Sequence, residues 1–217
     1  MSSRAAVPFE TDELGQELAQ LAARHIAEEG LSYGQAKRKA AKQAGIAPHH
    51  AAMPSNPVIE QALREYQAAY LADTQPAELA ALRGIALKWM ATLAALDGMS
   101  EPVRTLAAGA VVNGTAGEHS PVHLQVFLDE SKHFEIALIN SGHPAGQAMQ
   151  YSDTVLDGLN CPVLVLHDRG VPIVLTLLPA KRYKLPQMKP DHSPFDHPQL
   201  ANATQLQLMM QTKPQTH

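Results

Sequence analysis

Three polar residues between positions 120 and 135 have side chains that could act together in catalysis. Ser120, His123 and Glu135 are, in type, a nucleophile, a general base and a carboxylate that orients the base. A catalytic serine of this kind commonly stands in a G-x-S-x-G turn, and the chain contains no such turn. The three residue types alone therefore do not indicate a catalytic triad.

The histidines and the single cysteine are the next residues to consider, because both types bind metal ions. Among the eleven histidines, His119 and His123 are four positions apart, but a loop-to-strand junction does not place them on one helical face. Cys161 precedes Pro162 at the start of a strand-like segment, which is typical of a small core residue. The sequence predicts no metal site and no resident cofactor.

Four basic residues gather on one short predicted helix, and such donors could contact phosphates. Lys37, Arg38, Lys39 and Lys42 follow a glycine-centred turn in an arrangement typical of helix-turn-helix proteins. Residues 1–50, however, hold six Lys and Arg against six Asp and Glu, so no net positive field builds up there. This balance of charge favours a solvated helix face, with nucleic-acid contact as the alternative.

The elements that must position these residues begin with helices. Apolar residues at helical spacing, together with start and stop signals, predict four helices, at about 11–29, 32–45, 57–71 and 76–97. Ser32 and Gln35 form a capping-box pattern, and Asn56 before Pro57 is a start signal. In the fourth helix, Leu82, Trp89 and Leu93 belong to an apolar stripe that predicts a buried face.

The hydrophobic period then changes to two, which predicts strands. A short helix is expected at 100–108, strands at 111–112, 122–127 and 134–138, a hairpin turn at 129–132, and a second hairpin from 163 to 178. This order predicts an α+β fold, with a helical N-terminal region followed by a small mixed or antiparallel sheet. The expected domains are a helical region at 1–50, an α+β domain at 57–180 and a tail at 181–217.

One stretch carries a resemblance to a known fold. Residues 109–127, GAVVNGTAGEHSPVHLQVF, contain a Gly-small pair, a Gly-Thr-Ala turn, a serine and an alternating strand. This resembles the nucleotidyltransferase signature shared by minimal nucleotidyltransferases and polymerase β-like enzymes, and it implies that Gly114, Thr115, Ser120 and His123 lie at a ligand. The span 14–142 also resembles an uncharacterised bacterial protein family in its pieces EEGLSYGQAKRKAA, DTQPAEL, NGTA, LQVF and EIALIN.

The activity of that fold depends on an Asp-x-Asp pair that holds Mg²⁺ ions. Pro121 and His123 stand at those two places, and Glu135 is the one stand-in for the third carboxylate. The resemblance therefore implies a catalytically degenerate protein that binds a nucleotide, a nucleic acid or a protein partner. One alternative is an active, Mg²⁺-dependent transferase using Glu135, and another is a DNA-binding regulator that acts through residues 32–45.

Composition and charge limit the remaining classes. Seventeen Lys and Arg against twenty-one Asp and Glu give a net charge of −4, which excludes a generally basic nucleic-acid coat. No apolar run approaches the roughly 18 residues of a membrane span, and one cysteine cannot form an internal disulfide. The expected protein is cytoplasmic and has no membrane partner.

Overall fold

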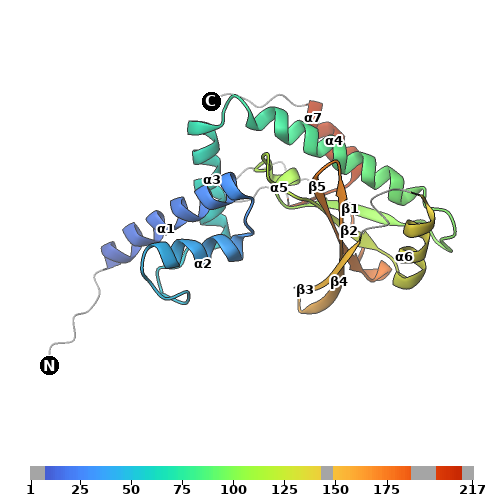
Figure 1. Ribbon diagram of the computed structural model, residues 1–217, viewed down its shortest axis with the longest axis horizontal. Helices are drawn as coiled ribbons and strands as arrows, with labels where there is room; N and C mark the ends of the chain where they lie inside the picture. Colours follow the sequence, from blue (N-terminus) through green and yellow to red (C-terminus); the bar gives the residue numbers. More distant parts are fainter. Residues whose placement is uncertain (1–7, 143–148, 187–198, 212–217) are drawn as a thin grey trace. The chain divides into compact units, whose positions relative to one another are not determined.

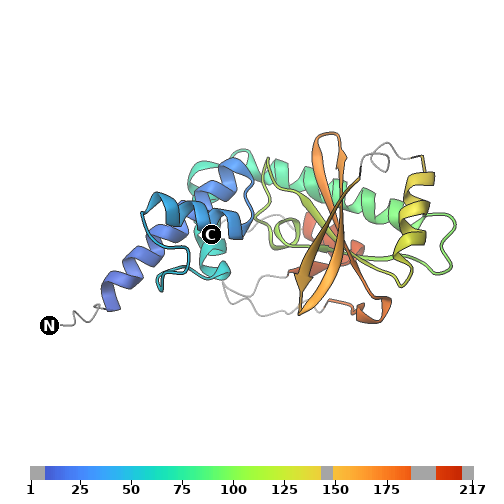
Figure 2. The same ribbon diagram turned by 60° about the horizontal axis from the view of Figure 1, so that its bottom comes forward.

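The computed structural model describes residues 8–142, 149–186 and 199–211, and divides the chain into two compact units. The first unit contains the helices up to Pro76, and the second contains the sheet and the helices packed on it. Each unit has its own hydrophobic cluster. In Figures 1 and 2 the helices of the first unit are drawn in blue to teal, and most strands of the second unit are light green to orange.

The first unit consists of three helices, α1 (Pro8–Glu29), α2 (Tyr33–Gln43) and α3 (Asn56–Tyr70). The capping box predicted at α2 is confirmed, because the Gln35 N–H donates to Ser32 Oγ and the Ser32 N–H donates to Gln35 Oε1. The expectation that Asn56 caps α3 is wrong by one position, since Ser55 is the N-cap residue. Helix α1 packs against both other helices through small apolar residues.

The second unit is built on a six-stranded mixed sheet in the order β3-β4-β5-β2-β1-β6. Its strands are β1 (Arg104–Ala108), β2 (Val122–Phe127), β3 (Gln150–Leu156), β4 (Leu159–Asp168), β5 (Val171–Leu178) and β6 (Leu200–Ala201). Neighbouring strands are antiparallel except β2 and β5, which run parallel in the middle of the sheet. The predicted α+β class, with helices first and then a mixed sheet, is confirmed.

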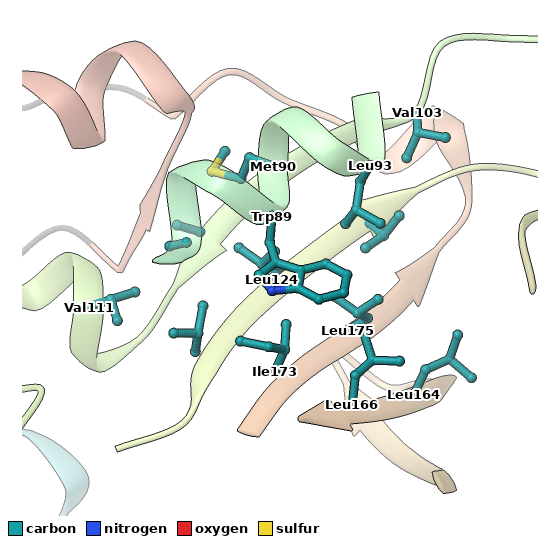
Figure 3. Close-up of a cluster of buried hydrophobic side chains, with 14 of the residues drawn as sticks. Trp89, Met90, Leu93, Val103, Val111, Leu124, Leu164, Leu166, Ile173 and Leu175 are labelled. Carbon is teal, nitrogen blue, oxygen red and sulfur yellow. The ribbon is translucent and has the colours of Figure 1, made fainter. Parts of the chain in front are cut away.

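One face of this sheet forms the larger core. Trp89 and Leu93 point from α4 (Gln75–Ala94) towards strand residues such as Leu124 and Leu175, and Met90 belongs to the same cluster (Figure 3). Helices α6 (Ser131–Asn140) and α7 (Ala203–Gln211) contribute buried side chains to the same cluster. The predicted buried stripe of α4 is confirmed, because Leu82, Trp89 and Leu93 are all buried.

The opposite face of the sheet has only a small apolar cluster of its own. Leu106, Phe127, Cys161 and Leu178 form this cluster, and Tyr183 packs against it. Cys161 is fully buried there, which confirms its prediction as a core residue.

Two local predictions for the segment after β2 are wrong. Residues 134–138 belong to helix α6 and not to a strand. The hairpin turn expected at 129–132 is therefore absent, and the chain passes from β2 into that helix. The alternation of Phe134, Ile136 and Leu138 is typical of a strand, but the buried positions are Phe134, Ala137 and Leu138, while Ile136 is exposed. Apolar residues on both sides of a short helix thus produce a period of two in the sequence.

The segment before β2 is the other place where the elements differ. Residues 104–108, expected in a helix, form β1, and Val111 and Val112, expected in a strand, lie in the short helix α5 (Ala110–Asn113). Strand β1 forms because β2 and β6 pair with it on its two sides, and neither pairing is visible in its alanine-rich sequence. Among the described residues, no helix is long and apolar enough to cross a membrane.

Candidate ligand-binding cleft

A cleft of about 700 Å³ lies in the second unit and is called the sheet cleft here. Its floor comes from the second face of the sheet, and its rim comes from the segment that follows β5 and from the residues that precede β6. The lining residues are Leu106, Ala108, Gly109, Gln125, Phe127, Leu156, Asp157, Leu178, Lys181, Arg182, Lys184, Gln199 and Leu200. The cleft therefore combines an apolar floor with a polar, mainly cationic rim.

Three cations line the sheet cleft, and one carboxylate opposes them. Lys181, Arg182 and Lys184 follow β5 within six positions and are all exposed. Among the described residues of the lining Asp157 is the single acidic one, and its Oδ2 lies 3.9 Å from an Arg182 nitrogen. Both partners of that pair are largely exposed, so it holds Arg182 weakly. The cleft consequently presents a net positive charge to solvent.

A short 3-10 helix, η2 (Ala180–Arg182), fixes the start of this cationic segment. Asp129, directly beyond the end of β2, accepts a hydrogen bond from the Ala180 N–H at 3.0 Å. The backbone of residues 180–182 is thereby tied to the central strand. The cations are therefore anchored at their base, while the ends of their side chains remain accessible.

Tyr183 lies within the same segment and packs on the sheet. Its ring meets the Phe127 ring edge-on with centroids 5.2 Å apart, and the Arg104 guanidinium lies 5.2 Å from the Tyr183 centroid. Arg104 and Phe127 are cross-strand partners in β1 and β2. This stack adds a fourth cation beside the cleft and gives the segment 181–184 a fixed apolar support.

The predicted ligand residue His123 stands on the same face of β2 as Gln125, because side chains two positions apart share a face. On the neighbouring strand β1, Ala108 is the residue paired with His123. Ala108 lines the cleft, whereas His123 does not. Desolvation by the surrounding protein lowers the pKa of His123 below its ordinary value. The His123 side chain is nevertheless exposed to solvent, and the lowered pKa favours the neutral form of its imidazole near pH 7.

The turn between β1 and β2 holds the other residues that the sequence predicted. Thr115 is buried, and both its N–H and its hydroxyl donate to Asn113 Oδ1, at 3.1 and 2.8 Å. Gly114 has φ of 91° at the end of α5, and Ser120 is half-buried just before β2. None of these three residues lines the sheet cleft, whereas Gly109, at the start of the same turn, does.

Arg83 of α4 holds this turn in place. Its Nε donates to the carbonyl of Val111 at 2.8 Å, and its two terminal nitrogens donate to the carbonyls of Met209 and Val112 at 3.2 and 3.4 Å. Desolvation lowers the pKa of the guanidinium. One cation thus joins α4, α5 and α7 and positions Gly109 at the cleft.

Glu135 does not lie where the sequence placed it. The residue was expected on a strand beside β2, but it belongs to α6, whose buried residues Phe134 and Leu138 pack into the larger core on the other face of the sheet. The sheet therefore separates the helix that carries Glu135 from the sheet cleft. The structure therefore corrects the expected strand position of Glu135 to a position on helix α6.

The predicted nucleic-acid residues all lie on α2 in the first unit. Lys39 is bound to Glu29, with its Nζ 2.6 Å from Oε1, and the same oxygen lies 2.8 Å from His25 Nδ1. Arg38 and Lys42 are exposed and line a shallow hollow on this helix, while Lys37 is half-buried. The structure therefore places Arg38, Lys39 and Lys42 together on a solvent-facing surface of α2, whereas Lys37 lies outside it.

The residues at the cleft do not fit a Mg²⁺ site. Mg²⁺ prefers hard oxygen ligands, usually carboxylates, and the β2 side chains on the cleft side are His123, Gln125 and Phe127. On the neighbouring strand β5, the residue paired with Gln125 is Thr176. In the described ranges, no group of three or more His, Cys, Asp or Glu residues could hold a metal ion.

The three cations of the cleft were not predicted as site residues from the sequence. Lys181, Arg182 and Lys184 were assigned to the tail that begins at 181, and part of that tail, 187–198 and 212–217, lies outside the described residues. A local signal was present in the run KRYK, where an aromatic residue lies among cations directly after a strand. Its neighbours in space, on β1 and β2, could not be inferred from that run.

Comparisons with known proteins give structural neighbours only. No protein-family model and no curated relative matches the chain. Among solved structures, the chain is similar to Cid1 poly(U) polymerase with MgGTP bound, at 17% identity and a TM-score of 0.31, covering 46% of this chain and 32% of that one. A cytoplasmic RNA terminal U-transferase matches at 19% identity and a TM-score of 0.25, with 52% and 29% covered.

The chain thus spans about a third of the length of these polymerases. A likeness with TM-scores of 0.31 and 0.25 carries no argument about this chain, so its function has to be argued from its own residues.

Proposed function

We propose that the second unit binds the phosphate groups of a nucleotide in the sheet cleft and carries out no metal-dependent nucleotidyl transfer. The observation that supports this is the rim of Lys181, Arg182 and Lys184 against the single carboxylate Asp157. Lysine and arginine form charge-assisted hydrogen bonds to phosphate oxygens, which are about twice as strong as neutral ones. A strongly anionic group is therefore the ligand that this rim suits.

The floor of the cleft supports a ligand with an apolar part as well. Leu106, Phe127 and Leu178 lie beneath the cationic rim, and Gln125 and Gln199 can both donate and accept hydrogen bonds. A nucleotide joins a flat base, with apolar faces and polar edges, to a charged phosphate chain. This combination matches the two kinds of surface better than inorganic phosphate does.

The absence of transfer in this proposal rests on the donor set. His123, Gln125 and Thr176 offer one imidazole, one amide and one hydroxyl where the fold's usual chemistry needs carboxylates. Glu135 lies on α6 and packs with the other face of the sheet. The proposed role is therefore binding or regulation.

Equilibrium binding of labelled nucleoside triphosphates to the full chain tests the proposal, with and without Mg²⁺. The double variant Lys181→Gln/Lys184→Gln is expected to weaken binding about tenfold or more, because two charge-assisted phosphate contacts are lost. A matched variant, Lys37→Gln/Lys42→Gln, removes the same charge from α2 and should bind like the wild type. Equal binding by the cleft variant and the wild type would refute the proposal.

A transfer assay tests the second half of the proposal. The chain is incubated with labelled nucleoside triphosphates, candidate acceptors and either Mg²⁺ or Mn²⁺, and no metal-dependent label transfer is expected. Transfer that disappears in Glu135→Gln would overturn the proposal in favour of an active transferase.

Binding of a short single-stranded RNA is measured with the same variants. Preferential loss of RNA binding in Lys37→Gln/Lys42→Gln would instead favour nucleic-acid contact through α2.

A further inference from the structure

The first unit carries an open groove between α1 and α3 that the sheet cleft does not involve. The groove has a volume of about 620 Å³, and its polar and aromatic lining is Glu17, Arg24, Glu28, Glu65, Tyr66 and Tyr70. It is called the acidic groove here. Leu21 and Ala62 form part of its floor.

Part of the charge in the acidic groove is already paired. Arg24 Nε lies 3.0 Å from Glu28 Oε1, and the Tyr66 hydroxyl donates to the same carboxylate at 2.7 Å. These contacts, with Tyr66 first, lower the pKa of Glu28 and keep it anionic. Glu17 and Glu65 take part in no ion pair within the described part of the chain. The groove therefore presents two uncompensated carboxylates.

Two tyrosines add an aromatic surface beside these carboxylates. The Tyr66 and Tyr70 rings are tilted by 40° with centroids 4.8 Å apart, and Tyr70 is 72% exposed. An exposed aromatic face attracts a guanidinium group through cation–π contact and stacking. Carboxylates next to an open tyrosine ring are suited to a cationic side chain, and to arginine in particular.

A complementary surface exists on α2 of the same unit. A shallow hollow of about 650 Å³ is lined by Leu31, Gln35, Arg38, Lys39, Lys42 and Gln43. Lys39 is neutralised by Glu29, whereas Arg38 and Lys42 are exposed and form no ion pair among the described residues. Arg38 and Lys42 are four positions apart, so they lie on one face of the helix. This surface is called the α2 basic face.

We propose that the acidic groove of one copy of the chain binds the α2 basic face of a second copy. Arg38 would stack on Tyr70, and Arg38 and Lys42 would neutralise Glu17 and Glu65. Both surfaces belong to one packed helical unit and no ion pair joins them, so the contact is made between copies. A contact between two different patches is heterologous and adds copies head to tail.

The contact is small and mainly electrostatic, so it is weak and sensitive to salt. It makes no use of the sheet cleft, and its failure would leave the proposed nucleotide binding untouched. The proposal chooses self-association over nucleic acid for the α2 basic face because the acidic groove supplies a matching partner in the same chain. Nucleic acid becomes an outcome of the experiment.

Sedimentation velocity of the nuclease-treated full chain measures the association over a range of protein concentrations. The weight-average mass should rise with concentration at about 50 mM salt and return to that of the monomer at about 500 mM, because screening grows over this range. Two charge-reversed variants, Glu17→Lys/Glu65→Lys and Arg38→Glu/Lys42→Glu, should each remain monomeric. All four residues are exposed, and circular dichroism confirms that the variants fold.

An equimolar mixture of the two reversed variants is the decisive sample. In each variant alone, the groove between α1 and α3 and the α2 face carry charges of the same sign. In the mixture, the groove of either variant is opposite in charge to the α2 face of the other variant, so association should return. The control Asp97→Lys/Glu101→Lys makes the same change in net charge as Glu17→Lys/Glu65→Lys, but on exposed residues of the second unit. It should associate like the wild type.

A wild type that stays monomeric at all concentrations would overturn the proposal. So would association that survives in both reversed variants, or a mixture that stays monomeric. Association that is present only before nuclease treatment would also overturn it, and would assign the α2 basic face to nucleic acid.

Discussion

The indole of Trp89 and the carboxylate of Asp168 are joined by a buried hydrogen bond, with Nε1 3.0 Å from Oδ2. Trp89 is fully buried and Asp168 is 9% exposed. Lys88 places its Nζ 2.8 Å from the same oxygen, so consecutive residues of α4 both bind the last residue of β4. This pair of contacts fixes α4 against the sheet whose other face forms the cleft.

Removing the carboxylate should destabilise the second unit. In Asp168→Ala the indole N–H loses its acceptor in the core, and the loss of unfolding free energy should be about 1–3 kcal/mol. Lys88→Met removes only the half-exposed cation and should cost less than about 1 kcal/mol. Urea denaturation compares the two variants, and equal losses would contradict the assignment of the indole as the main partner.

Removing the indole itself should have a larger effect. Trp89→Ala leaves a cavity in the main core and should lower the unfolding free energy by about 3–5 kcal/mol. Trp89→Phe keeps most of the packing and loses the hydrogen bond, so it should fall between the alanine variant and the wild type. A loss below about 1 kcal/mol for Trp89→Ala in chemical denaturation would show that the stripe is not core.

Arg83 should be hard to replace because its planar guanidinium group donates hydrogen bonds to three backbone carbonyls. Arg83→Lys has a single nitrogen and cannot bind the carbonyls of Val111, Val112 and Met209 together, so we expect a loss of about 1.5–3 kcal/mol. Weakened nucleotide binding should accompany it, because Arg83 positions the turn that carries Gly109 to the cleft. Denaturation and binding assays of the same variant check both effects.

His123 should make stability depend on pH in the mildly acidic range. Its pKa is lowered in the folded state from the ordinary value of 6.5, so below that pH the unfolded chain binds more protons than the folded one. The contribution of His123 is complete above pH 6.5 and is lost as the pH falls towards the folded-state pKa. His123→Gln should flatten this part of the profile of unfolding free energy against pH, and an unchanged profile would contradict it.

The α2 cations should contribute little to folding. Changing Lys37, Arg38 and Lys39 together to Gln removes one exposed ion pair, Lys39 with Glu29, and should alter the unfolding free energy by less than about 1 kcal/mol. Thermal and chemical denaturation measure the change. A larger loss would mean that these residues have structural partners beyond Glu29.

The helices of the first hundred residues could be predicted from the sequence, because their determinants are local. The capping box of Ser32 and Gln35 and the stripe of Leu82, Trp89 and Leu93 repeat at the spacing of one helix and appear in the structure as expected. The hairpin of β4 and β5 is equally local, with a turn at Arg169 and Gly170, both at positive φ.

Tertiary pairing decided the elements around the cleft. Residues 104–108 become a strand only because β2 and β6 hydrogen-bond to them, and Glu135 lies on a helix because Phe134 and Leu138 enter the core one helical turn apart. The sheet cleft brings Gly109, Gln125 and Lys181 together from three separate segments. Their proximity depends on the parallel pairing of β2 with β5, a long-range contact that leaves no periodic signal in the sequence.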